Sequence, residues 1–329
     1  MKRVVLVLGM LAVLGRAAAA QGATHVLIVT GLSGDPQFAT EFGRAARAIY
    51  DTARSQWHVA DSSLIYLAED PAADPTRIRE KSTKDALTRA FDVLGRRAAP
   101  GDLVLVFLLG HGSGEMEDAA VNLPGPDPVA RDYAAWLHQL DRATVVFINA
   151  SSGSGDFLPV LSGPNRVIIT ATRTSLERNE SVFGTYMARG LTDVAADANK
   201  DGHISVLEAF LFAQQEVTKV YTSTNRMQTE HGQLDDDGDR KGTPTPGTTG
   251  VGDGMLAARI AFGGKSASTD PRVTALVAEQ RVLEAQVDSL KRRKATTDST
   301  AYQTELERLL ILIAQKTQAI NAITGVKQP

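Results

Sequence analysis

The 329-residue chain contains no cysteine. This absence excludes disulfide bonds, metal–thiolate sites and catalysis by a thiol nucleophile. The chain also lacks an excess of basic charge, because its 35 lysines and arginines are outnumbered by 38 aspartates and glutamates. The formal net charge is −3, and a mildly acidic chain is not expected to bind the phosphate backbone of a nucleic acid.

The first 21 residues have the pattern of a secretory signal peptide. Lys2 and Arg3 precede the apolar run Val4–Leu14, and Ala17–Ala20 form a small-residue cleavage site. The apolar run is too short to span a bilayer, which takes a helix of about 20 residues. Cleavage near Ala20 would remove three basic residues and change the formal charge from −3 to −6. We therefore expect a secreted or periplasmic protein with no transmembrane segment after cleavage.

Residues 22–224 alternate between apolar runs and segments with apolar residues at helical spacing. Leu103–Leu109 and Val145–Ile148 are continuously apolar, which is typical of strands buried on both faces of a parallel sheet. The other expected strands are His25–Thr30, Leu64–Leu67 and Val167–Ala171, and the expected helices are Phe38–Ala53, Ser82–Arg97 and Val206–Tyr221. The sequence predicts one α/β domain with a mainly parallel sheet flanked by helices, and ligands of such sheets bind at the carboxyl ends of the strands.

Two turns rich in glycine and serine follow directly from two of these strands. Gly110-His111-Gly112-Ser113 follows Leu103–Leu109, and Ser152-Gly153-Ser154-Gly155 begins 41 positions after His111. Together with the run Gly163–Leu191, these blocks resemble the caspase/legumain-type cysteine peptidases, and in particular exported bacterial members, over roughly residues 23–215. The chain departs from the family pattern because no cysteine stands at the nucleophile position.

The resemblance implies a role for each retained group. His111 would protonate the leaving amine, and the Gly112 N–H would help to bind the oxyanion. Ser152 is aligned with the family's cysteine, while a rival alignment puts Ala150 there. Without a thiolate, we expect a catalytically inactive homologue that binds a peptide or protein partner. The alternative is a weak Ser–His hydrolase that uses Ser152 and His111, although such a pair normally needs a third group to orient the imidazole.

The segment Asp197–Glu208 matches the twelve-residue EF-hand loop, with the turn glycine at Gly202 and an apolar residue at Ile204. This pattern predicts a Ca²⁺ site that stabilises the helix beginning near Val206. A polar turn that only caps this helix is the alternative. The expected ligands are Asp197, Asn199, Asp201, the carbonyl of His203, Ser205 and Glu208.

Residues 225–269 are rich in glycine, aspartate, threonine and proline, and the pattern predicts a long polar loop region. Within it, Asp235–Asp239 is acidic and contains a glycine but no terminal glutamate. This stretch is either a second, weak calcium loop or a solvated acidic turn.

Residues 270–325 show heptad spacing of apolar residues in two segments, which are separated by the polar stretch Ala295–Ser299. This pattern predicts an antiparallel helical hairpin. Its apolar stripe must be covered, either by the main domain or by a second copy in a homo-oligomer.

Overall fold

The structure is a computed structural model that describes residues 22–200, 202–248, 252–263 and 298–324, with single positions between 272 and 290. The predicted signal peptide of residues 1–21 lies outside the described residues, as do Asp201 and most of the first predicted C-terminal helix. Among the described residues, no helix is both long enough and apolar enough to cross a membrane.

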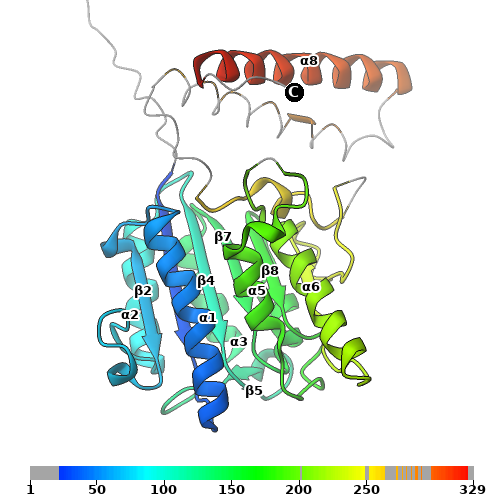
Figure 1. Ribbon diagram of the computed structural model, residues 1–329. Helices are drawn as coiled ribbons and strands as arrows, with labels where there is room; N and C mark the ends of the chain where they lie inside the picture. The colour runs from blue at the N-terminus through cyan, green and yellow to red at the C-terminus, as the bar shows by residue number, and fades with distance from the viewer. Residues whose placement is uncertain are drawn as a thin grey trace, which may run out of the picture.

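A seven-stranded sheet forms the centre of the molecule, in the order β3-β2-β1-β4-β7-β8-β9 (Figure 1). Its strands run parallel except β9, which is antiparallel to β8. This arrangement confirms the predicted α/β fold with a mainly parallel sheet. The bounds are β1 Thr24–Thr30, β2 Leu64–Ala68, β3 Glu80–Lys81, β4 Leu103–Leu109, β7 Thr144–Asn149, β8 Arg166–Thr170 and β9 Gln233–Asp235, with a separate pair formed by β5 Gly112–Ser113 and β6 Ala120–Val121.

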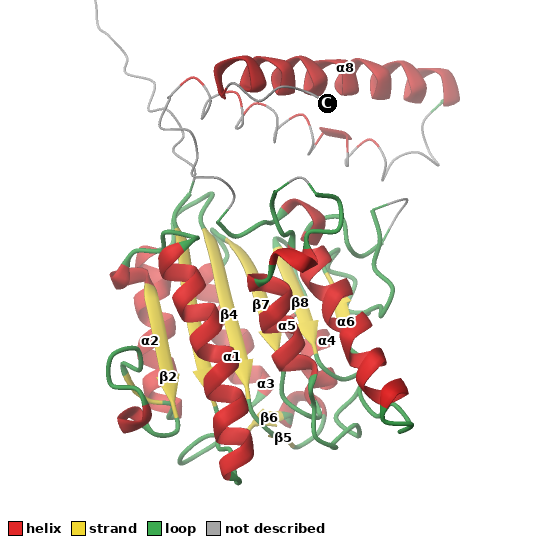
Figure 2. Cartoon of the chain, viewed as in Figure 1, coloured by secondary structure: helices red, strands yellow, loops and turns green. Residues whose placement is uncertain are grey.

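Helices cover both faces of this sheet (Figure 2). One face packs against α1 (Pro36–Ser55), α5 (Phe183–Thr192) and α6 (Val206–Ser223). The other packs against α2 (Lys84–Arg97), α3 (Ala130–Leu137) and α4 (Phe157–Leu161). Burial on both faces explains why the central strands are continuously apolar in sequence.

Side-chain caps set where the first two helices begin. The Asp35 carboxylate accepts a hydrogen bond from Gln37 N at 2.7 Å, so α1 begins at Pro36, two residues before the predicted start. Thr83 Oγ1 accepts from Ala86 N at 3.2 Å and begins α2 in the same way.

The region predicted as a polar loop differs from expectation, because it supplies strand β9. Gln233, Leu234 and Asp235 are all buried and pair with β8. The strand has one apolar residue between two polar ones, so it carries no apolar run that the sequence could reveal. Its polar residues are held by backbone pairing with β8 instead.

The C-terminal helix α8 extends over Ser299–Thr324. In Figure 1 it lies beyond the edge of the sheet where the parallel strands begin. The described positions between Arg272 and Leu290 are helical as well, and Val287 and Leu290 are buried in a small cluster with Leu309. Lys316 forms an ion pair with Glu279. Leu290 thus lies near Leu309 and Glu279 near Lys316, so the two helical segments run antiparallel, as in a hairpin.

Candidate functional site

The two glycine- and serine-rich turns meet at the carboxyl edge of the sheet, because β4 and β7 are neighbours. Gly112 N donates a hydrogen bond to Ser152 Oγ across the contact, with a distance of 3.3 Å. A Cβ on Gly112 would lie 2.2 Å from the carbonyl oxygen of Ser152 and 3.2 Å from Ser151 Oγ. Only glycine therefore allows the turns to approach this closely.

The serines of the second turn are buried and hydrogen bonded. Ser152 has 3% of its surface exposed. The Ser151 hydroxyl donates to Asn149 Oδ1 at 2.7 Å, and Ser154 Oγ accepts from Ala171 N at 3.0 Å. Ala150, the rival nucleophile position, contributes its side chain to the core beside Gly184. Both serine hydroxyls lie near the His111 loop, but it is the Ser152 hydroxyl that accepts a hydrogen bond from Gly112 N. The side chain of Ala150 packs in the core instead.

The side chain of His111 is oriented by groups other than Ser151 and Ser152. Its Nε2 lies 3.2 Å from the carbonyl oxygen of Ser33. The ring makes edge contacts with Phe38 and Phe42, at centroid distances of 4.8 Å and 5.5 Å. Within residues 22–200, which include both turns, no hydrogen bond joins the imidazole to Ser151 or Ser152. The candidate base and the candidate nucleophile share an edge of the sheet without forming a dyad.

Asp156 joins the second turn to two flanking loops. Its Oδ2 accepts from Met116 N at 2.8 Å and from Ser175 Oγ at 2.6 Å. Met116 and Leu176, on these two loops, are 77% and 73% exposed. The carboxylate thus holds two exposed apolar residues beside the serine turn.

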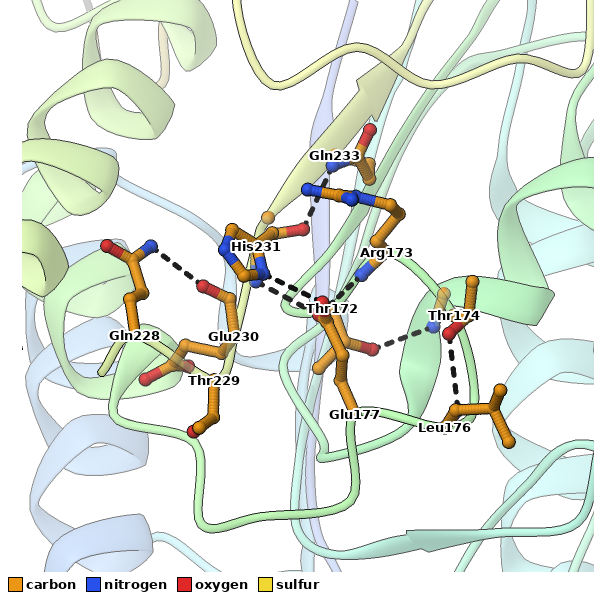
Figure 3. Close-up of polar contacts among 12 residues, drawn as sticks. Thr172, Arg173, Thr174, Leu176, Glu177, Gln228, Thr229, Glu230, His231 and Gln233 are labelled. Atoms are coloured by element: carbon orange, nitrogen blue, oxygen red, sulfur yellow. Dashed lines mark hydrogen bonds and ion pairs between the residues drawn. The ribbon is translucent and has the colours of Figure 1, made fainter. Parts of the chain in front are cut away.

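Glu177 ties the same turn to the segment before β9 (Figure 3). Its carbonyl accepts from Gly153 N at 2.8 Å. Its carboxylate accepts from Arg173 N at 2.9 Å and from His231 N at 3.1 Å, and it lies 2.7 Å from His231 Nδ1. The position of the serine turn therefore depends on residues distant in sequence.

Glu230 organises the start of α5 beside this segment. It is 2% exposed and accepts hydrogen bonds from Ser181 Oγ, Val182 N and Phe183 N at 2.6, 3.0 and 3.1 Å, and from the Tyr221 hydroxyl at 3.3 Å. Burial raises the pKa of this carboxyl, and the four donors only partly oppose the rise.

No sequence motif points to Asn149, Asp156 or Glu177 as part of this site. Asn149 could have been noticed as the polar residue that ends an apolar strand. Asp156 and Glu177 carry no such signal, because their partners are backbone amides and side chains in other loops.

The predicted calcium loop lies at the opposite, amino edge of the sheet, between α5 and α6. Gly202 N donates to Asp197 Oδ2 at 3.0 Å, and Gly202 has the left-handed φ of 87° expected for the turn glycine. Within the part of the chain that the structure describes, Asp197 Oδ1 is buried and has no hydrogen-bond partner. Glu208 Oε1 accepts from Ala198 N and Asn199 N at 3.1 and 3.2 Å, which folds this carboxylate onto the loop.

The remaining predicted ligands lie in the same loop, except that Asp201 is outside the described residues. Ser205 and Glu208 form a capping box at the start of α6. A cavity of about 570 Å³ opens beside the loop, lined by residues that include Trp57, His203 and Phe262. This cavity is at the edge opposite to His111.

A strap of residues 252–263 connects this loop to the acidic stretch after β9. Asp236 accepts from Gly254 N at 2.8 Å and from Ala257 N at 2.7 Å. Further along the strap, Ile260 accepts from Val206 N at 2.8 Å. Burial and the neighbouring carboxylates raise the pKa of Asp253, which also lies on the strap, to about 7.

The chain matches no known protein-family profile and no curated protein sequence. Among solved structures it is similar to caspase-1 from Spodoptera frugiperda, with 12% sequence identity and a TM-score of 0.41. The similarity covers 66% of this chain and 87% of that chain. An identity this low establishes neither a family nor an activity.

Proposed function

We propose that this chain is an exported, peptidase-related protein that binds an extended peptide or protein segment at the carboxyl edge of its sheet without cleaving it. One observation carries the proposal: the Gly112 N–H, the expected oxyanion donor, is occupied by the hydroxyl of Ser152. An oxyanion hole works through donors that are preorganised and free to meet the developing charge. Here the Gly112 N–H, the expected donor, is hydrogen bonded to the hydroxyl of the candidate nucleophile Ser152.

The surroundings of His111 support the same conclusion. The general base of a serine hydrolase must hydrogen bond to the hydroxyl that it activates. The imidazole instead approaches the carbonyl of Ser33 and packs against Phe38 and Phe42. The complete absence of cysteine removes the other nucleophile that could act without strong activation.

Exposed apolar residues beside the turns support a binding role. Met116 and Leu176 are held on neighbouring loops by Asp156, and Arg178 links the loops through an ion pair with Glu115 at 2.8 Å. Both loops are tied to the same Asp156 carboxylate, and exposed apolar side chains gathered on one surface are typical of sites that bind other chains. The signal-like first 21 residues support export.

Calcium at the loop 197–208 is part of the proposal, as a stabilising ion far from the binding edge. The Gly202–Asp197 hydrogen bond, the left-handed Gly202 and the unpartnered Asp197 Oδ1 support it. Asp197, Asn199, Ser205, Glu208 and the His203 carbonyl would supply oxygen ligands from the described residues, and a hard cation prefers such ligands.

Labelling by a fluorophosphonate probe tests the absence of catalysis. We expect no labelling of the purified protein and no cleavage of a fluorogenic peptide library. Labelling that is lost in both Ser152→Ala and His111→Ala would overturn the proposal and establish the weak Ser–His hydrolase. Ser152→Cys sharpens the test, because a thiol beside His111 should give cleavage that His111→Ala abolishes. Ala150→Cys is the matched control, since its side chain points into the core.

Binding is tested separately by fluorescence anisotropy with a positional library of labelled extended peptides. We expect the tightest peptides to lose at least tenfold in affinity for Met116→Asp/Leu176→Asp. Val194→Asp is the control, because Val194 is 79% exposed but lies between α5 and the calcium loop. Equal affinities for wild type and the double variant would contradict a binding site at this edge.

A further inference from the structure

We propose that Asp235, Asp237 and Asp239 form a second cation site, distinct from the loop 197–208, and that this site takes Ca²⁺. One carboxylate oxygen of each residue lies within 4.8 Å of one from each of the other two. Asp235 ends β9, while Asp237 and Asp239 are exposed in the turn that follows. The cluster is therefore anchored in the sheet on one side and open to solvent on the other.

An unpartnered buried oxygen points to a ligand. Asp235 is 1% exposed, and its Oδ1 accepts from Gly238 N at 3.0 Å. Its Oδ2 is buried and has no hydrogen-bond partner among the described residues. Burial raises the pKa of the Asp235 carboxyl, and the Ser162 hydroxyl, which accepts from Arg240 N at 3.2 Å, opposes this rise but leaves Oδ2 unpartnered. A buried polar atom without a partner is unfavourable. A cation held between the three carboxylates would give Asp235 Oδ2 the partner that it lacks.

The two basic residues nearest in sequence do not take this place. Arg240 and Lys241 follow the cluster in sequence, yet neither forms an ion pair with Asp235, Asp237 or Asp239 in the part of the chain that the structure describes. They contribute backbone N–H groups instead, and Lys241 N donates to Asp239 Oδ1 at 2.7 Å. The turn is folded with its carboxylates already gathered, and their mutual repulsion is not offset by a basic residue.

The chemistry of the donors selects the class of ion. Three carboxylates and no histidine or cysteine suit a hard cation, which excludes zinc and copper as preferred occupants. Ca²⁺ accepts irregular geometries and a variable number of oxygen ligands, whereas Mg²⁺ demands a near-ideal octahedron. A turn that offers one buried and two exposed carboxylates suits the irregular coordination of Ca²⁺ better than the octahedron of Mg²⁺.

The position of the cluster gives the ion a structural consequence. Asp236, between two of the ligands, binds the strap 252–263 through Gly254 N and Ala257 N. The strap in turn accepts from Val206 N, at the exit of the loop 197–208. Binding at the Asp235 cluster should therefore order the strap and stabilise the neighbouring calcium loop.

Isothermal titration of the full mature chain with CaCl₂ tests the proposal. We expect two sites in the wild type, one in Asp237→Asn, one in Glu208→Gln and none in the double variant. Asp85→Asn, an exposed change on α2, should keep both sites. Because Asp237 is exposed, its substitution should not disturb folding. Asp239→Asn repeats the test at a second ligand of the same site.

Each contrary outcome has a distinct meaning. An unchanged number of sites in both Asp237→Asn and Asp239→Asn would overturn the second site and leave the loop 197–208 standing. A wild type with one site that survives in Glu208→Gln and is lost in Asp237→Asn would support the second site and reject the first. Saturation by MgCl₂ at equal or lower concentration than CaCl₂ would overturn the assignment to calcium.

A thermal melt separates ion binding from simple repulsion. Without calcium, Asp237→Asn should melt at the same temperature as the wild type or higher, because one repelling charge is gone. With millimolar calcium the order of the two melting temperatures should reverse, since the wild type binds an ion at the Asp235 cluster and the variant does not. A variant that stays more stable than the wild type at every calcium concentration would show that the cluster is only repulsive.

Discussion

The two edges of the sheet use buried polar groups in opposite ways. At the carboxyl edge, the hydroxyls of Ser151 and Ser152 are hydrogen bonded within the turns, and Glu230 accepts four hydrogen bonds. At the amino edge, Asp197 Oδ1 and Asp235 Oδ2 are buried without a partner. Asn149 Nδ2 is also unpartnered at the carboxyl edge, but it is neutral. Among the described residues, the atom left without a partner at the carboxyl edge is thus a neutral amide nitrogen, whereas the acidic loops at the amino edge leave two carboxylate oxygens without one.

Gly112→Ala should most severely disrupt the carboxyl edge. The added Cβ would meet the Ser152 carbonyl oxygen at 2.2 Å, and a backbone atom cannot move aside as a flexible side chain can. We expect a loss of about 3 kcal/mol in the free energy of unfolding, at the upper end of overpacking costs. Urea denaturation measures it. Gly247→Ala is the control, because no described residue lies within 4 Å of its Cβ and its φ needs no glycine. Equal losses in the two variants would mean that the turns do not touch.

Glu230 should give the carboxyl edge a pH dependence. Its folded-state pKa is raised above the usual value of 4.5, chiefly by burial. Its contribution to stability is therefore fully present below pH 4.5 and is lost as the pH rises through the raised pKa. Glu230→Gln lowers stability by about 2 kcal/mol, because an amide cannot accept from four donors, and it should flatten this part of the profile. Urea midpoints from pH 4 to pH 7 test this, and parallel profiles for the two proteins would contradict it.

Calcium removal should act on the amino edge alone. If the loop 197–208 binds with the weak affinity of extracellular modules, millimolar calcium stabilises the fold by about 1–2 kcal/mol. Glu208→Gln should remove the part of the rise in melting temperature between EGTA and CaCl₂ that this loop contributes, and leave the part that depends on Asp237. Ser152→Ala, at the other edge, should leave that rise intact. If the melting temperature does not respond to calcium, neither the loop 197–208 nor the turn Asp235–Asp239 binds the ion, and both are ordinary polar turns.

Ser152→Ala should have the smallest effect. The substitution leaves the Gly112 N–H without its acceptor, at a cost of about 1 kcal/mol. Peptide affinity should stay within a factor of three of the wild type, since Met116 and Leu176 are untouched. A loss of affinity beyond tenfold would show that the hydroxyl itself contacts the bound peptide.

The sequence revealed the sheet because buried parallel strands are continuously apolar, and β4 is predicted at the residues where it occurs. It also placed His111 and Ser152 correctly at strand ends, because an open parallel sheet brings these ends together. It could not reveal β9, whose pairing depends on the backbone of β8. The hydrogen bonds of His111 and Ser152 were equally hidden, since their partners Ser33 and Gly112 are fixed by tertiary packing.

The short outer strands limit how this molecule can associate with itself. An unpaired strand edge offers a template on which another chain can add and aggregate. At one side, β3 has only two residues. At the other, Leu234 is the residue of β9 that faces away from β8, and both its amide and its carbonyl are hydrogen bonded to Thr243 at 3.0 and 2.9 Å. Intermolecular sheet extension and fibril growth from these two borders are therefore disfavoured.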